Sequence, residues 1–158
     1  MSKRGTSKPY SMPEFLAHAI AMETEAADRY HELADMMEAH GNMEVSKLFR
    51  DMTRYSEMHR DSIKERAANV ELPQLRSWQY RWVTPPEVGD EYGFDYALHP
   101  YHALEYARTN ELQAMRFYQK VAYTAQDEKL EKLATDFANE EEEHAAAINK
   151  LLEMTLRP

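Results

Sequence analysis

The chain of 158 residues contains no cysteine and only four glycines. The absence of cysteine excludes disulfide bonds, Cys-ligated zinc or iron–sulfur centres and thiol catalysis, so histidine and carboxylate remain as the strong metal ligands. No apolar run approaches the ~20 residues of a membrane-spanning helix. The polar start, residues 1–8, lacks the apolar region of a signal peptide, and we therefore expect a cytoplasmic protein without a membrane partner.

Positive charge is in deficit. The chain has 19 basic and 28 acidic residues, a formal net charge of −9, so we expect no nucleic-acid partner. Alanine, glutamate, methionine and leucine are abundant and glycine is scarce, which predicts an all-α protein. At this length we expect a flexible arm at residues 1–10 and one domain at residues 11–158.

Four stretches carry the three-and-four spacing of apolar residues that is typical of amphipathic helices. They run from a Ser-x-x-Glu capping box at Ser11 to about Ala39, and over Met43–Asn69, Pro100–Tyr123 and Asp127–Met154. The short links inside the first and second pairs predict two antiparallel hairpins. The segment 70–99 between the hairpins is rich in aromatic residues and predicts an ordered crossover, long enough for the second and third helices to run in the same direction.

Ionisable residues interrupt the apolar stripes of these helices. In the last helix, Glu141 and His144 fill the gap between Phe137 and Ile148, where core residues are expected. Burial of either group alone is costly, and pairing with a metal ion is the simplest compensation. Glu-x-x-His directed into a helical bundle is a ligand pattern of carboxylate-bridged metal proteins.

The two hairpins are related by an internal repeat. The first contains Glu23-x-x-Ala-x-x-x-Tyr30, and the second contains Glu111-x-x-Ala-x-x-x-Tyr118. The alignment then pairs His59 with His144 and Ser56 with Glu141, and the turn of the second hairpin is three residues shorter. The repeat therefore joins residues on all four helices into one candidate metal site.

This doubled pattern resembles the ferritin-like superfamily, and within it the rubrerythrin-like di-iron carboxylate proteins. The resemblance implies a four-helix bundle of two hairpins with a long crossover, and two bound iron ions, with manganese or zinc as alternatives. It implies Glu23 and Glu111 as terminal ligands, His59 and His144 as imidazole ligands and Glu141 as a bridge. The sequence departs from the family at Ser56, where a second bridging carboxylate is expected.

The resemblance implies oxidation of Fe(II) or reduction of O2 or peroxide, with Tyr30 and Tyr118 as hydrogen-bond donors near the ligands. Because the chain has no cysteine for a rubredoxin-type centre, electrons would come from an external donor. Two alternatives are a bundle with an incomplete site that binds metal or acts as a scaffold without catalysis, and an iron-storage subunit. We expect a homodimer, since the aromatic crossover and ten methionines offer apolar surface.

Two further interpretations make no use of a metal. The buried glutamates could be neutralised by arginines, for which Arg54, Arg60 and Arg108 are the candidates. The acidic run of Glu140, Glu142 and Glu143 is interpreted as a solvated helix face.

Overall fold

A computed structural model describes residues 9–75 and 99–158 of the protein. These residues form helices α1 (Met12–Ala39), α2 (Met43–Arg66), α4 (Pro100–Thr124) and α5 (Glu128–Glu153). The prediction of an all-α chain is confirmed, and most predicted helix ends agree within one residue. The aromatic residues of the predicted crossover lie outside the described residues.

Helix α2 is shorter than predicted, ending at Arg66 instead of Asn69. After Arg66 the backbone forms a turn, in which the Val70 N–H donates to the Ala67 carbonyl at 3.0 Å. The proline at position 73 disfavours helical backbone at the residue before it, so the helix has to end in this region.

Local signals set the other helix boundaries. The predicted capping box is present, because the Glu14 N–H donates to Ser11 Oγ at 3.2 Å and the Ser11 N–H donates to Glu14 Oε1 at 3.1 Å. Gly41 has a φ of +77° in the turn between α1 and α2, a conformation that glycine adopts without steric cost. Tyr10, the last residue of the predicted arm, packs edge-on against the ring of Phe117 at 5.6 Å.

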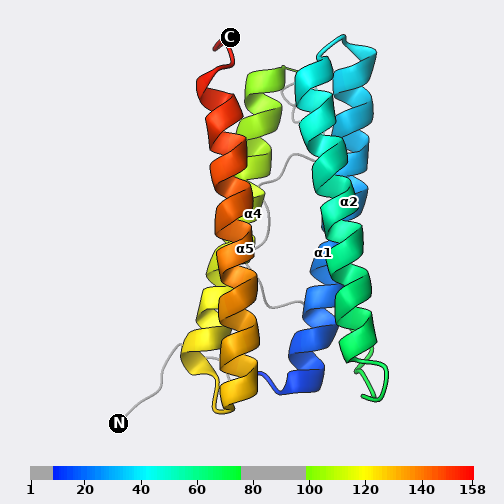
Figure 1. Ribbon diagram of the computed structural model, residues 1–158, viewed down its shortest axis with the longest axis vertical. Coiled ribbons are helices and arrows are strands. Elements are labelled where there is room, and N and C mark those ends of the chain that lie inside the picture. Colours follow the sequence, from blue (N-terminus) through cyan, green and yellow to red (C-terminus); the bar gives the residue numbers. More distant parts are fainter. Residues whose placement is uncertain (1–8, 76–98) are drawn as a thin grey trace.

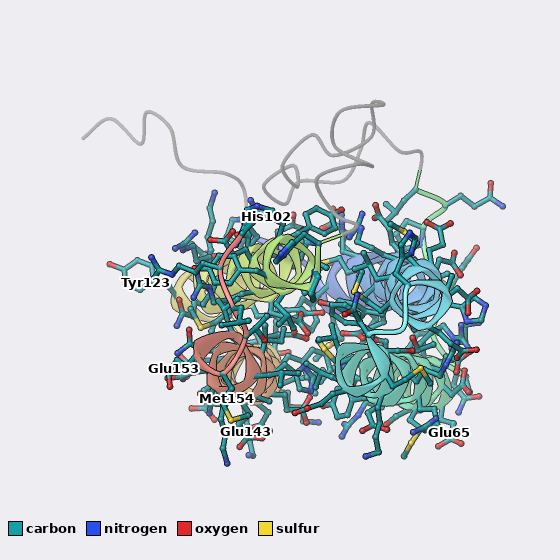
Figure 2. The ribbon with its side chains drawn as sticks, turned by 90° about the horizontal axis from the view of Figure 1, so that it is seen from above. Glu65, His102, Tyr123, Glu143, Glu153 and Met154 are labelled. Atoms are coloured by element: carbon teal, nitrogen blue, oxygen red, sulfur yellow. The ribbon has the colours of Figure 1, made fainter. Side chains whose placement is uncertain are left out.

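The helices form two antiparallel hairpins, α1 with α2 and α4 with α5, and α2 runs in the same direction as α4, as predicted (Figure 1). The two helices of each hairpin pack closely, whereas α1 and α4 of different hairpins make far fewer contacts. Seen end-on, the four helices lie at the corners of a square, and charged side chains such as Glu65 and Glu143 point outward (Figure 2). None of the described helices is both long and apolar enough to span a membrane.

Two apolar clusters form the core of the bundle. The first, toward the turn between α1 and α2, includes Tyr30, Met37, Phe49, Leu104 and Ile148. The second, toward the turn between α4 and α5, includes Phe15, Ile63, Phe117, Tyr118 and Phe137. Burial of this apolar surface drives folding. Four buried ionisable residues, Glu23, His59, Glu111 and Glu141, occupy a polar layer between the two clusters.

Candidate metal centre

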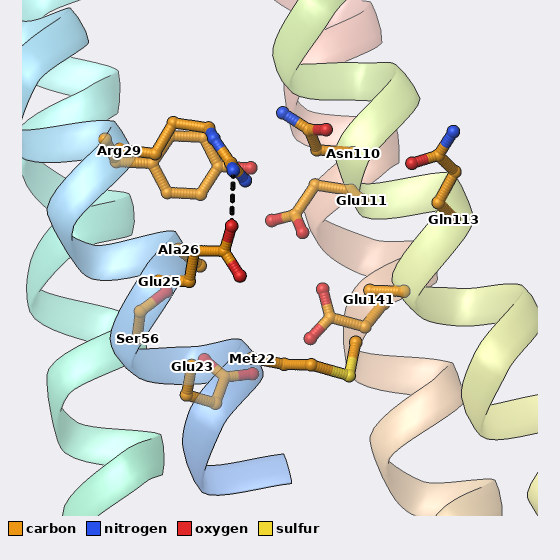
Figure 3. A pocket seen from close by; sticks show the side chains of 12 residues that line it. Met22, Glu23, Glu25, Ala26, Arg29, Ser56, Asn110, Glu111, Gln113 and Glu141 are labelled. Atoms are coloured by element: carbon orange, nitrogen blue, oxygen red, sulfur yellow. Dashed lines mark hydrogen bonds and ion pairs between the residues drawn. The ribbon is translucent and has the colours of Figure 1, made fainter. Parts of the chain in front are cut away.

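All five predicted ligand residues lie in this polar layer, and each helix contributes at least one. Helix α1 supplies Glu23, α2 supplies His59, α4 supplies Glu111, and α5 supplies Glu141 and His144. The three glutamates are between 3% and 6% exposed. Figure 3 shows the two hairpins contributing carboxylates that face one another across a gap. The ionisable residues that interrupt the apolar stripes therefore lie close together in the structure.

The converging side chains form two overlapping groups that could hold metal ions. The first group is Glu23, His59 and Glu141, and the second is Glu111, Glu141 and His144; in each, one ligand atom per residue lies within 4.8 Å of the others. His59 Nδ1 is 3.1 Å from Glu23 Oε1, and His144 Nδ1 is 3.4 Å from Glu111 Oε1. Glu141 belongs to both groups, so its carboxylate lies where one group could bridge two ions.

The carboxylates perturb one another because they are close and buried. Burial raises the pKa of Glu141 well above its usual range, and the charges of Glu111 and Glu23 raise it further. Burial by itself would lower the pKa of His144, but hydrogen bonding to Glu111 and the charge of that residue outweigh it and raise the pKa. The layer therefore favours bound cations: protons in the metal-free chain, or metal ions.

In the part of the chain that the structure describes, no arginine forms an ion pair with Glu23, Glu111 or Glu141. The three arginines considered as partners bind elsewhere: Arg54 pairs with Asp51, Arg60 with Asp61, and Arg108 with Asn149. That interpretation of the sequence is wrong for these residues. Their positions on the helices direct the guanidinium groups to neighbours outside the polar layer.

The donor atoms present fit a divalent metal ion. Both ring nitrogens of His59 are buried and lack a well-directed hydrogen bond, although the Glu23 carboxylate lies 3.1 Å from one of them. Imidazole and carboxylate together suit iron, manganese and zinc. A cation bound at Nδ1 would satisfy this nitrogen and reduce the repulsion among the buried carboxylates.

The two repeat tyrosines approach the site from opposite ends of the bundle. Tyr30 is 1% exposed and Tyr118 is fully buried. Burial raises the pKa of both hydroxyls. The second-largest increase comes from the charge of Glu111 for Tyr30 and from the charge of Glu23 for Tyr118. For each tyrosine, the largest effect of a charge on the pKa thus comes from a glutamate of the other hairpin. The reason is that α1 and α4 run in opposite directions past the same layer (Figure 1).

The acidic run on α5 is only partly a solvated face. Glu142 and Glu143 are exposed, as predicted. Glu140 instead places Oε2 3.4 Å from His59 Nε2, so the prediction is wrong for this residue. Glu140 is adjacent to Glu141 and therefore lies ~100° around the helix, on the side toward α2. Sequence reasoning missed it because the position of α2 relative to α5 was not known.

A cavity of about 50 Å³ lies beside the carboxylates (Figure 3). Ser56 of α2 lines it together with Glu23, Glu111 and Glu141, and an ion pair of 2.9 Å between Arg29 and Glu25 lies at its edge. Such a space holds a few molecules the size of water. Ser56 is therefore in the layer, at the position where the repeat predicts a carboxylate, and its neighbour Glu57 is exposed.

Raising the pH above the ordinary glutamate pKa of about 4.5 is expected to destabilise the metal-free chain. With its raised pKa, Glu141 keeps a proton in the folded chain at pH values where the unfolded chain has lost it. The folded state then binds more protons, so its stability falls as the pH rises. His144 acts in the same sense above its ordinary value of 6.5.

Urea unfolding in the presence of a chelator, at a series of pH values, measures this dependence. Glu141→Gln should flatten it, because the variant removes one of the two titrations. Glu142→Gln, at an exposed position of the same helix, is the control and should leave the slope unchanged. The same slope in Glu141→Gln as in the unsubstituted chain would contradict the prediction.

Comparison with known proteins gave two matches. The sequence model of the rubrerythrin family matches residues 14–86 and 102–156. The crystal structure of an uncharacterized conserved protein from Magnetospirillum magnetotacticum MS-1 is similar at 56% identity and a TM-score of 0.85, covering 94% of this chain and 98% of that one. A comparison with curated proteins found no match.

Proposed function

The chain belongs to the rubrerythrin family, and on that basis we propose that it is a di-iron carboxylate protein that oxidises Fe(II) or reduces O2 or peroxide. The observation that carries the proposal is the position of Glu141, which is shared by two buried groups of carboxylate and imidazole ligands. In this assignment Glu23 and His59 would hold one ion, Glu111 and His144 would hold the other, and Glu141 would contribute its carboxylate to both. Manganese and zinc fit the same ligands.

Bound iron would supply the electrons for reduction of oxygen or peroxide, and the chain's own residues would control what reaches it. The cavity beside Ser56 is small enough to exclude bulky substrates and large enough for a diatomic molecule. The buried hydroxyls of Tyr30 and Tyr118 would donate hydrogen bonds near the carboxylates. Regeneration of reduced iron would need an external electron donor, because the chain has no cysteine to bind a rubredoxin-type iron centre.

A second candidate function is supported by Ser56. A family site with a serine in place of one bridging carboxylate has one negative charge fewer, and such a bundle could bind metal or act as a scaffold without catalysis. Iron storage would need a closed assembly of many copies, and sedimentation analysis would distinguish it from the homodimer that we propose.

Anaerobic Fe(II) loading, followed by exposure to O2 or to peroxide, tests the proposal. We expect close to two irons per chain. Their oxidation should be visible as the growth of a ferric absorption band. The variant Ser56→Glu is measured alongside. One iron in the unsubstituted chain, rising to two in Ser56→Glu, would favour the incomplete site. Absence of tight metal binding in both, with the helices intact by circular dichroism, would overturn the metal-protein assignment.

A further inference from the structure

Glu140 is the one member of its acidic run that reaches the polar layer. Its side chain is 39% exposed, yet Oε2 lies 3.4 Å from Nε2 of His59 on the neighbouring helix. The two acidic residues that follow its neighbour Glu141, at positions 142 and 143, are exposed. The contact therefore does not follow from the composition of the run. It follows from the packing of α5 beside α2 (Figure 2).

The two nitrogens of the His59 ring face different groups. Nδ1 faces Glu23 at 3.1 Å, and Nε2 faces Glu140 at 3.4 Å. The lone pairs of an imidazole diverge, so a single ion cannot bind through both nitrogens. An ion held by Glu23, Glu141 and Nδ1 leaves Nε2 to carry the proton, and Glu140 lies where it can accept that proton's hydrogen bond. Glu140 is thus placed outside the ligand set and directly behind one ligand.

We propose that Glu140 is a positioning residue, which accepts a hydrogen bond from Nε2–H of His59 and so presents Nδ1 to the metal ion. The inference rests on the proposed function, because it assigns a role at the same centre. A carboxylate behind a ligating histidine fixes its tautomer and ring orientation and increases its basicity.

The charge of Glu140 also bears on the serine at position 56. Glu23, Glu111 and Glu141 bring three negative charges to two divalent ions with four positive charges, and Ser56 brings none. Glu140 supplies a fourth carboxylate from α5, close to the half of the site that includes His59. In this chain, Glu140 of α5 thus partly replaces the negative charge of the carboxylate that the repeat predicts at position 56 of α2.

Tyr55 supports this arrangement from α2. Its ring lies 5.8 Å from the His59 ring and 4.1 Å, edge-on, from the His144 ring. Burial raises the pKa of its hydroxyl, and the neighbouring Glu140 carboxylate raises it further. Tyr55 therefore lies beside both Glu140 and His59. Among the described residues, no carboxylate contact is found at Nε2 of His144, so the support is specific to one half of the site.

The test compares Glu140→Ala with Glu142→Ala, which removes the same charge from an exposed position of the same helix. Anaerobic Co(II) titration, followed by optical absorption, measures the affinity of each ion in the full chain. In Glu140→Ala we expect one of two ions to bind about 10- to 100-fold more weakly, with the other unchanged. Glu140→Gln should lose less, because its amide oxygen still accepts the hydrogen bond. Glu142→Ala should match the unsubstituted chain.

A second readout does not depend on affinity. In the Zn(II)-loaded chain, ¹⁵N NMR should show a protected Nε2–H on His59 that persists in Glu140→Gln and is lost in Glu140→Ala. The inference is overturned if Glu140→Ala binds both ions like the unsubstituted chain, or if both ions weaken equally. Failure of the unsubstituted chain to bind any ion would instead overturn the proposed function, and the inference with it. Thermal unfolding of the metal-free variants confirms that each is folded.

Discussion

Glu141→Ala is expected to abolish tight binding of both metal ions, whereas Glu23→Ala should remove only one. Glu141 is the only residue common to the two ligand groups, so its loss takes a carboxylate from each ion. Glu23 belongs to one group, and its removal leaves Glu111, Glu141 and His144 in place. The iron content after anaerobic loading and gel filtration measures the difference, with about two, one and no irons per chain expected for the unsubstituted chain, Glu23→Ala and Glu141→Ala.

Loss of binding in Glu141→Ala should not come from unfolding. Glu141 is 3% exposed and lies among like charges that raise its pKa, so its replacement removes the cost of burying this carboxyl in the metal-free chain. We expect the metal-free variant to unfold at a temperature equal to or above that of the metal-free unsubstituted chain. Glu142→Ala, at an exposed position, should retain both ions. One ion retained in Glu141→Ala would show that the two groups bind independently and that no bridge is needed.

Metal loading is expected to stabilise the fold strongly. Because the ligands converge only in the folded chain, each ion contributes RT ln(1 + [M]/Kd), which is about 4 kcal/mol at a free metal concentration 1,000-fold above Kd. For a domain of this size, each kcal/mol raises the midpoint of thermal unfolding by about 2–4 °C, so each ion should raise it by about 8–16 °C. Scanning calorimetry of the loaded chain, and of the same sample after chelation, measures this shift.

The matched control for the metal effect is Glu141→Ala, whose unfolding midpoint should not respond to added metal. A response of this variant equal to that of the unsubstituted chain would place the stabilising ion elsewhere. Equal midpoints for the loaded and chelated unsubstituted chain would contradict the prediction directly, because an ion that binds tightly only to the folded state must stabilise it.

The helices and the candidate ligands could be predicted from the amino-acid sequence. Helical spacing of apolar residues depends only on local geometry, so the capping box at Ser11 and the boundaries near Ala39 and Thr124 could be predicted. Glu23, Glu111 and Glu141 were identifiable because each is a charged residue at a core position of its helix. The internal repeat then associated them with the two histidines, which the structure brings to the same layer.

Which groups meet across helices could be learned only from the folded structure. The contact of Glu140 with His59, the hydrogen bond of Arg108 with Asn149 and the approach of Tyr30 to Glu111 all join residues on different helices. Periodicity predicts which face of a helix is buried, but it does not give the rotation and offset of that helix relative to its neighbours. A residue at the edge of a buried face, such as Glu140, is therefore solvated or part of the site according to how the helices pack.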